Sequence, residues 1–466
     1  MYYALKEGAV EGMQELGKGN VASLRDVFLI DDKLNVKYIA SNGKEYGDEL
    51  EEKILEDETE IRFASKAFSE YVSKISGVTE EEMKFKWMKN QTKLTIDDPS
   101  IDSLEDLIFF PNLTSISMSK MKLSKLDGIE NCKKLKGFSV VDVQIENYES
   151  LSLLENIETI YIQEAGSLKD LENFIDSIKN FKRLTKLSLC ATNLKDIALL
   201  DALKNVNTLK YLNLGVNKIE NLNPLKNLTH LETLDLRNNL ISDVSPLKTL
   251  VKLKSLDLNK NNIIDVTPLA YNTNLISLNL KNNYQIDGNR NNYEGEKLEA
   301  LNKIGEILDK GGTIYLDIDK LGLFANYKSL DLSGQHLTTL EPLEGLTQLI
   351  ELNLTYNQLT LEDEKSQKIL ASMQNLETLY LNDNSLTNIS AINNMKNLKL
   401  LYIEGNEQID LSQIEDIISN LNNLRLGTNA LKTIKNCSPE KIQKLNIDYS
   451  AYLTEIPDLS IFTNLK

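Results

Sequence analysis

Residues that could support acid–base or nucleophilic catalysis are few and scattered in this 466-residue chain. It has two histidines, His230 and His336, which lie in separate parts of the sequence. Its three cysteines, Cys132, Cys190 and Cys437, are also far apart, and none belongs to a Cys-x-x-Cys pair. A Ser-His-Asp or Cys-His site requires partners in hydrogen-bond contact, and a disulfide framework or zinc site requires matched cysteine spacings. The sequence therefore predicts a protein that is not an enzyme and has no cofactor or metal.

One segment is rich in oxygen ligands, the run Asp-Gly-Asn-Arg-Asn-Asn at 287–292. A calcium-binding EF-hand loop needs glycine at its sixth position and glutamate at its twelfth. Here those positions are Asn292 and Leu298, so the pattern excludes an EF-hand. The glycine-containing runs at 17–20 and 309–312 are too short for a phosphate-binding loop.

The formal net charge of −17 argues against nucleic acid as a partner, because non-specific affinity for it comes from lysine and arginine on phosphates. No stretch is long and apolar enough to predict a transmembrane segment. The first residues, MYYALKEGAVEG, lack the basic and apolar regions of a signal peptide. The last residues, IFTNLK, look like the start of another repeat, so we expect the native protein to continue.

Binding is the chemistry that remains, and a repeat positions the residues for it. Three adjacent 22-residue segments begin at Leu209, Leu231 and Leu253 and share the pattern L-x-x-L-x-L-x-x-N-x-I, followed by a Pro-Leu pair. The same register predicts about fifteen repeats over residues 91–466, with a helix-containing insertion at 284–326. Such a period and motif are typical of leucine-rich repeats.

Each repeat predicts one short strand with a side-chain period of two. Leu234 and Leu236 point inward in this scheme, while Thr233, Asp235 and Arg237 point outward. Because a single turn cannot bury its own leucines, the turns must stack. The predicted fold class is α/β: a right-handed leucine-rich-repeat solenoid, or horseshoe, with a parallel sheet on its concave side.

An asparagine recurs where the chain leaves each strand and its backbone groups lose their ladder partners. An asparagine side chain can both donate to carbonyls and accept from amides. We therefore predict a structural asparagine ladder formed by Asn217, Asn239, Asn261, Asn283, Asn357, Asn384, Asn406 and Asn429.

The outward residues of the strands are not dictated by the fold, so they indicate what the concave face binds. Tyrosine and arginine are common interface anchors, and the mixed character of this face favours a protein ligand over a glycan. The predicted contacts are Tyr161, Tyr211, Asp235, Arg237, Asp257, Tyr380, Tyr402 and Arg425.

Two segments precede the array. The apolar spacing of residues 61–77 predicts a helix that ends at Gly77, within a helical N-terminal cap at 59–90 in which Trp87 packs. Residues 1–58 predict a small α+β extension, with a helix over 5–16 followed by strands in VFLIDD and LNVKYIA. This extension resembles the soluble end of a type IV pilin-like protein, and an unrelated extension is the alternative.

The repeat unit N-x-I-x-D-V-x-P-L, as in NNLISDVSPLKTL and NNIIDVTPLAYNT, resembles the internalin-type repeat of Gram-positive surface proteins. The resemblance is strongest over 209–283 and 327–360. It implies a non-enzymatic bacterial surface or extracellular module that binds a protein, with an export signal or anchor outside this sequence. A cytoplasmic scaffold or regulator of an enzyme is the alternative, since intracellular regulators of phosphatases use similar units. A third reading is an enzyme whose catalytic domain lies beyond this sequence.

Overall fold

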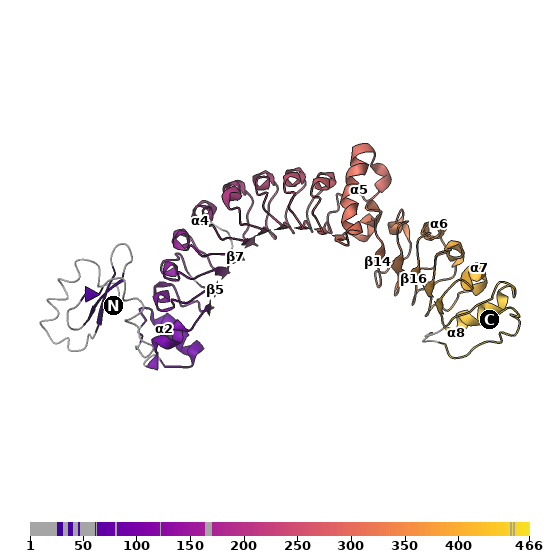
Figure 1. The fold of residues 1–466 in the computed structure, drawn as a ribbon, viewed down its shortest axis with the longest axis horizontal. Coiled ribbons are helices and arrows are strands. Elements are labelled where there is room, and N and C mark those ends of the chain that lie inside the picture. Colours follow the sequence, from indigo (N-terminus) through magenta and orange to yellow (C-terminus); the bar gives the residue numbers. More distant parts are fainter. Residues whose placement is uncertain are drawn as a thin grey trace. The chain divides into compact units, whose positions relative to one another are not determined.

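The computed structural model describes residues 26–30, 36–40, 45–46, 61, 63–79, 82–121, 123–163, 170–447, 450 and 453–466. The chain divides into two compact units, residues 1–217 and 218–466, which we call the N-terminal and C-terminal units. In each unit, short parallel strands stack along one side and helices line the other (Figure 1). The predicted fold class, an α/β leucine-rich-repeat solenoid, is confirmed by this arrangement.

The N-terminal unit begins with a small antiparallel sheet of β1 (Asp26–Ile30), β2 (Val36–Ala40) and β3 (Glu45–Tyr46). These strands agree with those predicted in VFLIDD and LNVKYIA. The helix predicted over residues 5–16 lies outside the described residues. The boundaries predicted at residues 58 and 90 stay predictions.

The predicted capping helix is α2 (Lys66–Ser76), which is followed by the short helix α3 (Phe85–Lys89). Helix α2 stops at Gly77, whose left-handed φ of 72° favours glycine. Phe68 is fully buried and packs against Phe110, with 6.0 Å between the ring centroids. Trp87 packs edge-on against the same Phe110 ring at 6.3 Å. The cap therefore covers the apolar end of the first turns.

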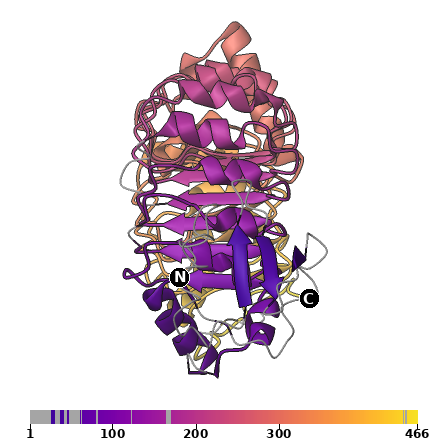
Figure 2. The ribbon, with the colours of Figure 1, turned by 90° about the vertical axis from the view of Figure 1, so that its left-hand side faces the viewer.

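Six parallel strands follow in the N-terminal unit, and Figure 2 shows them stacked one above another. Their inward leucines, isoleucines and phenylalanines are buried at alternate positions, as the period of two requires. The strands are β4 (Lys93–Ile96), β5 (Ser115–Ser119), β6 (Gly137–Val141), β7 (Thr159–Gln163), β8 (Lys186–Cys190) and β9 (Tyr211–Asn213). The opposite side carries η4 (Glu105–Phe109), η5 (Ile129–Asn131), η6 (Glu149–Leu153), α4 (Leu171–Ile178) and η7 (Ala198–Asn205).

Within its described residues the C-terminal unit has nine strands, which form two parallel groups with no hydrogen-bonded pairing from one group to the other. The first group is β10 (Thr233–Asp235), β11 (Ser255–Asp257), β12 (Ser277–Asn279) and β13 (Thr313–Tyr315). The second group is β14 (Ser329–Asp331), β15 (Glu351–Asn353), β16 (Thr378–Tyr380), β17 (Leu400–Tyr402) and β18 (Asn423–Arg425).

Short 3₁₀ and α-helices return the chain behind these strands. Proline is the second residue of η8 (Asn223–Leu225), η9 (Ser245–Thr249), η10 (Thr267–Tyr271) and η13 (Glu341–Leu343), where its fixed φ and missing N–H suit the first turn of a helix. The other 3₁₀ helices are η11 (Arg290–Asn292), η12 (Ile318–Leu323), η14 (Ser390–Asn394), η15 (Leu411–Ile414) and η16 (Thr433–Asn436). The α-helices are α5 (Gly295–Asp309), α6 (Glu364–Ser372), α7 (Glu415–Ile418) and α8 (Thr428–Lys432).

The predicted insertion at 284–326 contains α5 and β13. Ile314 and Leu316 point inward as the sequence predicted, and both are 4% exposed. After β13 the ladder of strands is interrupted, and β14 starts the second group. In each unit, the outward side chains of the parallel strands form a surface that we call the strand face of that unit.

Candidate functional site

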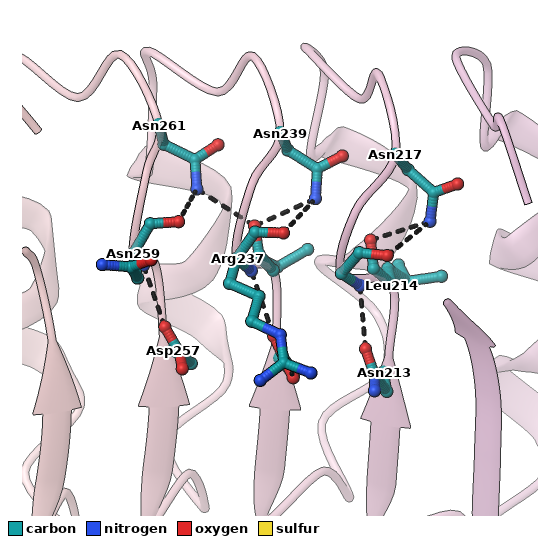
Figure 3. A network of polar contacts seen from close by, with 11 residues as sticks. Asn213, Leu214, Asn217, Arg237, Asn239, Asp257, Asn259 and Asn261 are labelled. Carbon is teal, nitrogen blue, oxygen red and sulfur yellow. Dashed lines mark hydrogen bonds and ion pairs between the residues drawn. The ribbon is translucent and has the colours of Figure 1, made fainter. Parts of the chain in front are cut away.

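The asparagines between the strand and the return path have a common geometry, visible for Asn217, Asn239 and Asn261 in Figure 3. The Asn261 amide group donates to the carbonyls of Leu236 and Leu258, each at 3.0 Å. Its Oδ1 accepts the Ile241 N–H at 3.1 Å. One side chain thus satisfies backbone groups of its own turn and of the preceding turn.

The same pattern recurs at Asn217, Asn239, Asn283, Asn357, Asn384 and Asn406, whose side-chain amides donate to backbone carbonyls and whose Oδ1 atoms accept backbone N–H groups. Asn429 does not follow it, and its predicted place in the ladder is wrong. The chain enters helix α8 at Thr428, so Asn429 lies in a helix and is exposed. Its amide contacts the Glu407 carboxylate instead of the backbone.

A second polar series was missed by sequence reasoning. It consists of the third residue of six strands, where aspartate or asparagine accepts the N–H two residues further on. The acceptor oxygens belong to Asn213, Asp235, Asp257, Asn279, Asp331 and Asn353, at 2.8 to 3.2 Å. Recurrence of Asp or Asn at this one position was the available sequence signal, because both residues form such local turns.

Asp235, Arg237 and Asp257 form one of the groups that the prediction placed on the strand face. Asp235 and Asp257 are paired in the parallel register of β10 and β11. Burial raises the pKa of Asp235 above its ordinary value, and the Asp257 charge adds to that shift, while Arg237 opposes it. Arg237 Nε lies 3.5 Å from Asp235 Oδ2. Both carboxylates also serve their own backbone, so this group is tied to the fold as well as exposed to a partner.

Tyr161 and Tyr211 lie in the N-terminal unit and are not brought together. Tyr161 is the third residue of β7, and serines occupy the equivalent positions of β6 and β8. Tyr211 is the first residue of β9 and is paired in register with Lys186. Each tyrosine is half-buried. None of the other predicted contacts is paired with either tyrosine on a neighbouring strand.

Tyr380, Tyr402 and Arg425 occupy the third position of three consecutive strands, β16, β17 and β18. The two tyrosine rings stack with centroids 4.5 Å apart and planes inclined by 25°. The Arg425 guanidinium carbon lies 4.7 Å from the Tyr402 ring centroid, which is a cation–π distance. These residues form what we call the Tyr–Tyr–Arg cluster, which contains three of the eight predicted contacts.

Acidic and apolar side chains border this cluster. Burial raises the pKa of Tyr380. The charge of Glu351 on β15 and the hydrogen bond between Glu351 and the tyrosine hydroxyl raise this pKa further, while the charge of Arg425 lowers it. Leu400, the first residue of β17, also points outward and is only half-buried. The cluster is therefore an amphipathic patch in which an acidic and a basic group flank two stacked rings.

Two classes of site can be assessed within the part of the chain that the structure describes. No helix there is long and apolar enough to cross a membrane. In the same ranges, no three histidine, cysteine, aspartate or glutamate side chains gather into a group that could hold a metal ion.

A sequence family described as leucine-rich repeats in two copies matches residues 207–249, 229–271 and 374–419. These matches cover β9 to β11 and β16 to β17. No curated protein matches the chain.

Several solved structures resemble the fold. An internalin of Listeria monocytogenes is 20% identical, with 87% of this chain and 94% of that chain covered and a TM-score of 0.36. A leucine-rich-repeat protein of Leptospira interrogans is 24% identical, with 75% and 90% covered and a TM-score of 0.46. The TLR13–ssRNA13 complex is 14% identical, with 81% and 74% covered and a TM-score of 0.37. Likeness at this level transfers no partner or activity to this chain.

Proposed function

We propose that this chain is a non-enzymatic recognition module and that a protein partner docks on the strand face of β14–β18 at the Tyr–Tyr–Arg cluster. The observation that carries the proposal is the stack of Tyr380, Tyr402 and Arg425 on adjacent strands. Tyrosine and arginine dominate the residues that contribute most to protein–protein affinity. Because the stack holds all three side chains in place, less conformational entropy is lost when a partner binds.

The surroundings of the cluster support a protein ligand. Leu400 and the two rings offer apolar area, while Glu351 and Arg425 lie at opposite ends and offer charges of opposite sign. Apolar area flanked by polar groups is the usual composition of a protein interface. We do not assign a nucleic acid partner to this face, because the chain has a net charge of −17 and the cluster has a single arginine.

The proposed setting is the bacterial cell surface or extracellular space, in adhesion or host interaction. It is supported by the likeness of the repeat units to those of internalins. A cytoplasmic scaffold that holds an enzyme is the second candidate, because the same face serves either role. Fractionation of the native cells, followed by immunodetection of this chain, separates the two.

The test is affinity capture with the chain and with a Tyr380→Ala/Tyr402→Ala/Arg425→Ala variant. A matched control, Tyr161→Ala/Tyr211→Ala, removes two half-buried strand-face tyrosines in the N-terminal unit. We expect the unchanged chain and the control to retain the same partner and the triple variant to lose it, with circular dichroism verifying that all three fold. Retention of the partner by the triple variant would refute the proposal.

A further inference from the structure

The ladder of strands in the C-terminal unit is interrupted between β13 and β14. Their first residues, Thr313 and Ser329, are 16 positions apart, whereas Ser329 and Glu351 of the next strand are 22 apart. Residues 313–331 are all described, and no backbone hydrogen bond joins these two strands. The shortened turn therefore ends one sheet and begins another on the same strand face.

Close packing on the side of the turn opposite the strands accompanies this interruption. A Cβ atom on Gly322 would lie 2.8 Å from the Glu344 carbonyl oxygen, and one on Gly288 would lie 2.6 Å from the Asp319 carbonyl oxygen. Only glycine permits such close approaches. Leu323 and Phe324, at the end of η12, are fully buried. The residues around η12 are thus tightly packed, while β13 and β14 are not paired with each other.

The alternation of backbone groups shows which atoms face the break. On β14 the Lys328 carbonyl and the Leu332 N–H bond to β15, so the N–H and C=O groups of Ser329 and Asp331 point the other way. Neither of these N–H groups has a hydrogen-bond partner within the described residues. Leu330, which should be fully covered like Leu352, is only half-buried. The side of β14 toward the break is an open sheet edge.

The β13 side is partly closed. Its Ile314 carbonyl, which faces the break, receives the Tyr327 hydroxyl at 3.5 Å, and the Tyr327 side chain is buried. Of the two strands, β14 therefore offers the more complete set of free donors and acceptors.

Acidic residues lie on β14, on its paired neighbour β15 and after β13, where Asp317 Oδ2 accepts the Asn282 N–H at 2.8 Å. Asp331 and Glu351 are exposed on the strand face, and Asp317 follows β13. The backbone and side-chain hydrogen bonds of Ser333 lower the pKa of Asp331, so it is ionised at neutral pH. Lys328, which precedes the first residue of β14, has its amine 3.3 Å from the Gln348 side-chain oxygen. A basic segment complements this charge.

We propose that the open edge of β14 binds an extended, basic segment of a partner polypeptide, which adds to the sheet as an extra strand. Main-chain hydrogen bonds to Ser329 and Asp331 supply the pairing, and lysine or arginine side chains meet Asp331, Glu351 and Asp317. This inference rests on the proposed function only in that the partner is a polypeptide. Since β14 and β16 lie about 10 Å apart in one sheet, a single partner can contact both the edge and the Tyr–Tyr–Arg cluster.

The probe is a capped synthetic peptide of four Lys-Val repeats, and its charge-matched control has four Lys-Pro repeats. The control carries the same charges but its prolines cannot complete a strand ladder. Hydrogen exchange followed by mass spectrometry or NMR reports the amides of Ser329 and Asp331. We expect the Lys-Val peptide to slow their exchange by about tenfold or more and the Lys-Pro peptide to leave it unchanged.

Two variants locate the effect. Ser329→Pro removes the Ser329 N–H, which makes no hydrogen bond to another strand of the described residues. Ser329→Ala keeps this N–H. We expect the proline variant to weaken binding of the Lys-Val peptide by about tenfold and the alanine variant to bind normally. If Ser329→Pro does not fold, Asp331→Lys is the substitute, with the same expected loss through reversed charge.

Equal binding of both peptides, or no protection of the two amides by the Lys-Val peptide, overturns the inference. The Tyr380→Ala/Tyr402→Ala/Arg425→Ala variant keeps the β14 edge and should bind the Lys-Val peptide normally. Its loss of the native partner, with the peptide still bound, supports the proposed function independently of the result at β14.

Discussion

The third strand position has opposite uses in two pairs of neighbouring strands of the C-terminal unit, β10–β11 and β16–β17. In β10 and β11 it holds Asp235 and Asp257, whose carboxylates turn back to accept N–H groups of their own chain. In β16 and β17 it holds Tyr380 and Tyr402, whose rings stack on each other. The fold needs an outward side chain at this position but no particular one. Polar residues there reinforce the turn, while aromatic residues leave the turn without that bond and present surface to a partner.

In both sheets the asparagine ladder holds the backbone of the turns that follow the strands. Removing one ladder asparagine should therefore have the largest effect on stability. We expect Asn261→Ala to lower the free energy of unfolding by about 1–3 kcal/mol, because it leaves the Ile241 N–H without its acceptor in the core. The carbonyls of Leu236 and Leu258 each lose one of two amide donors and keep the other, from Asn239 and Asn283. Urea unfolding followed by circular dichroism measures this loss of stability. The control is Asn429→Ala, which removes an exposed helical side chain and should change stability by less than about 0.5 kcal/mol.

Binding and stability should respond differently to substitutions in the two strand pairs, β10–β11 and β16–β17. We expect Tyr402→Ala to weaken capture of the native partner by about tenfold or more, since it removes the central ring of the cluster. Asp257→Ala should leave capture unchanged and cost about 1 kcal/mol of stability through the lost bond to the Asn259 N–H. Titration of the partner and thermal unfolding of both variants measure the two quantities. Loss of capture in Asp257→Ala would contradict the distinction between the two strand pairs.

The left-handed position before each ladder asparagine offers a smaller test. Asn238, Lys260 and Asn282 adopt positive φ there, and so does Val216, with φ of 58°. A β-branched residue is strained in this region, whereas asparagine tolerates it. We expect Val216→Asn to raise the free energy of unfolding by about 1 kcal/mol. Asn238→Val should lower it by a similar amount in the same urea titration, and stabilisation by both substitutions would contradict the strain argument.

Sequence periodicity predicted the strands, their inward leucines and most of the asparagine ladder because a 22-residue repeat imposes the same geometry each time. It failed at Asn429, where helix α8 replaces the ordinary exit from the strand. It also could not show that Tyr380, Tyr402 and Arg425 stack, since the strands that bring them together are set 22 and 23 residues apart. The break after β13 was invisible for a related reason. Its 16-residue step shows a shortened turn, but loss of pairing depends on how the glycines pack behind it.

The smallest effect concerns pH and compares two aspartates at the same strand position. Burial raises the pKa of Asp235, so the folded state holds its proton more tightly than the unfolded state and stability from this group rises as pH falls toward its pKa. The hydrogen bonds of Ser333 lower the pKa of Asp331, so its contribution is present above the ordinary aspartate pKa and is lost as pH falls below it. Asp235→Asn should therefore stabilise the chain at neutral pH, and Asp331→Asn should destabilise it. Unfolding measured between acidic and neutral pH tests this, and shifts of the same sign in both variants would show that burial does not distinguish the two sites.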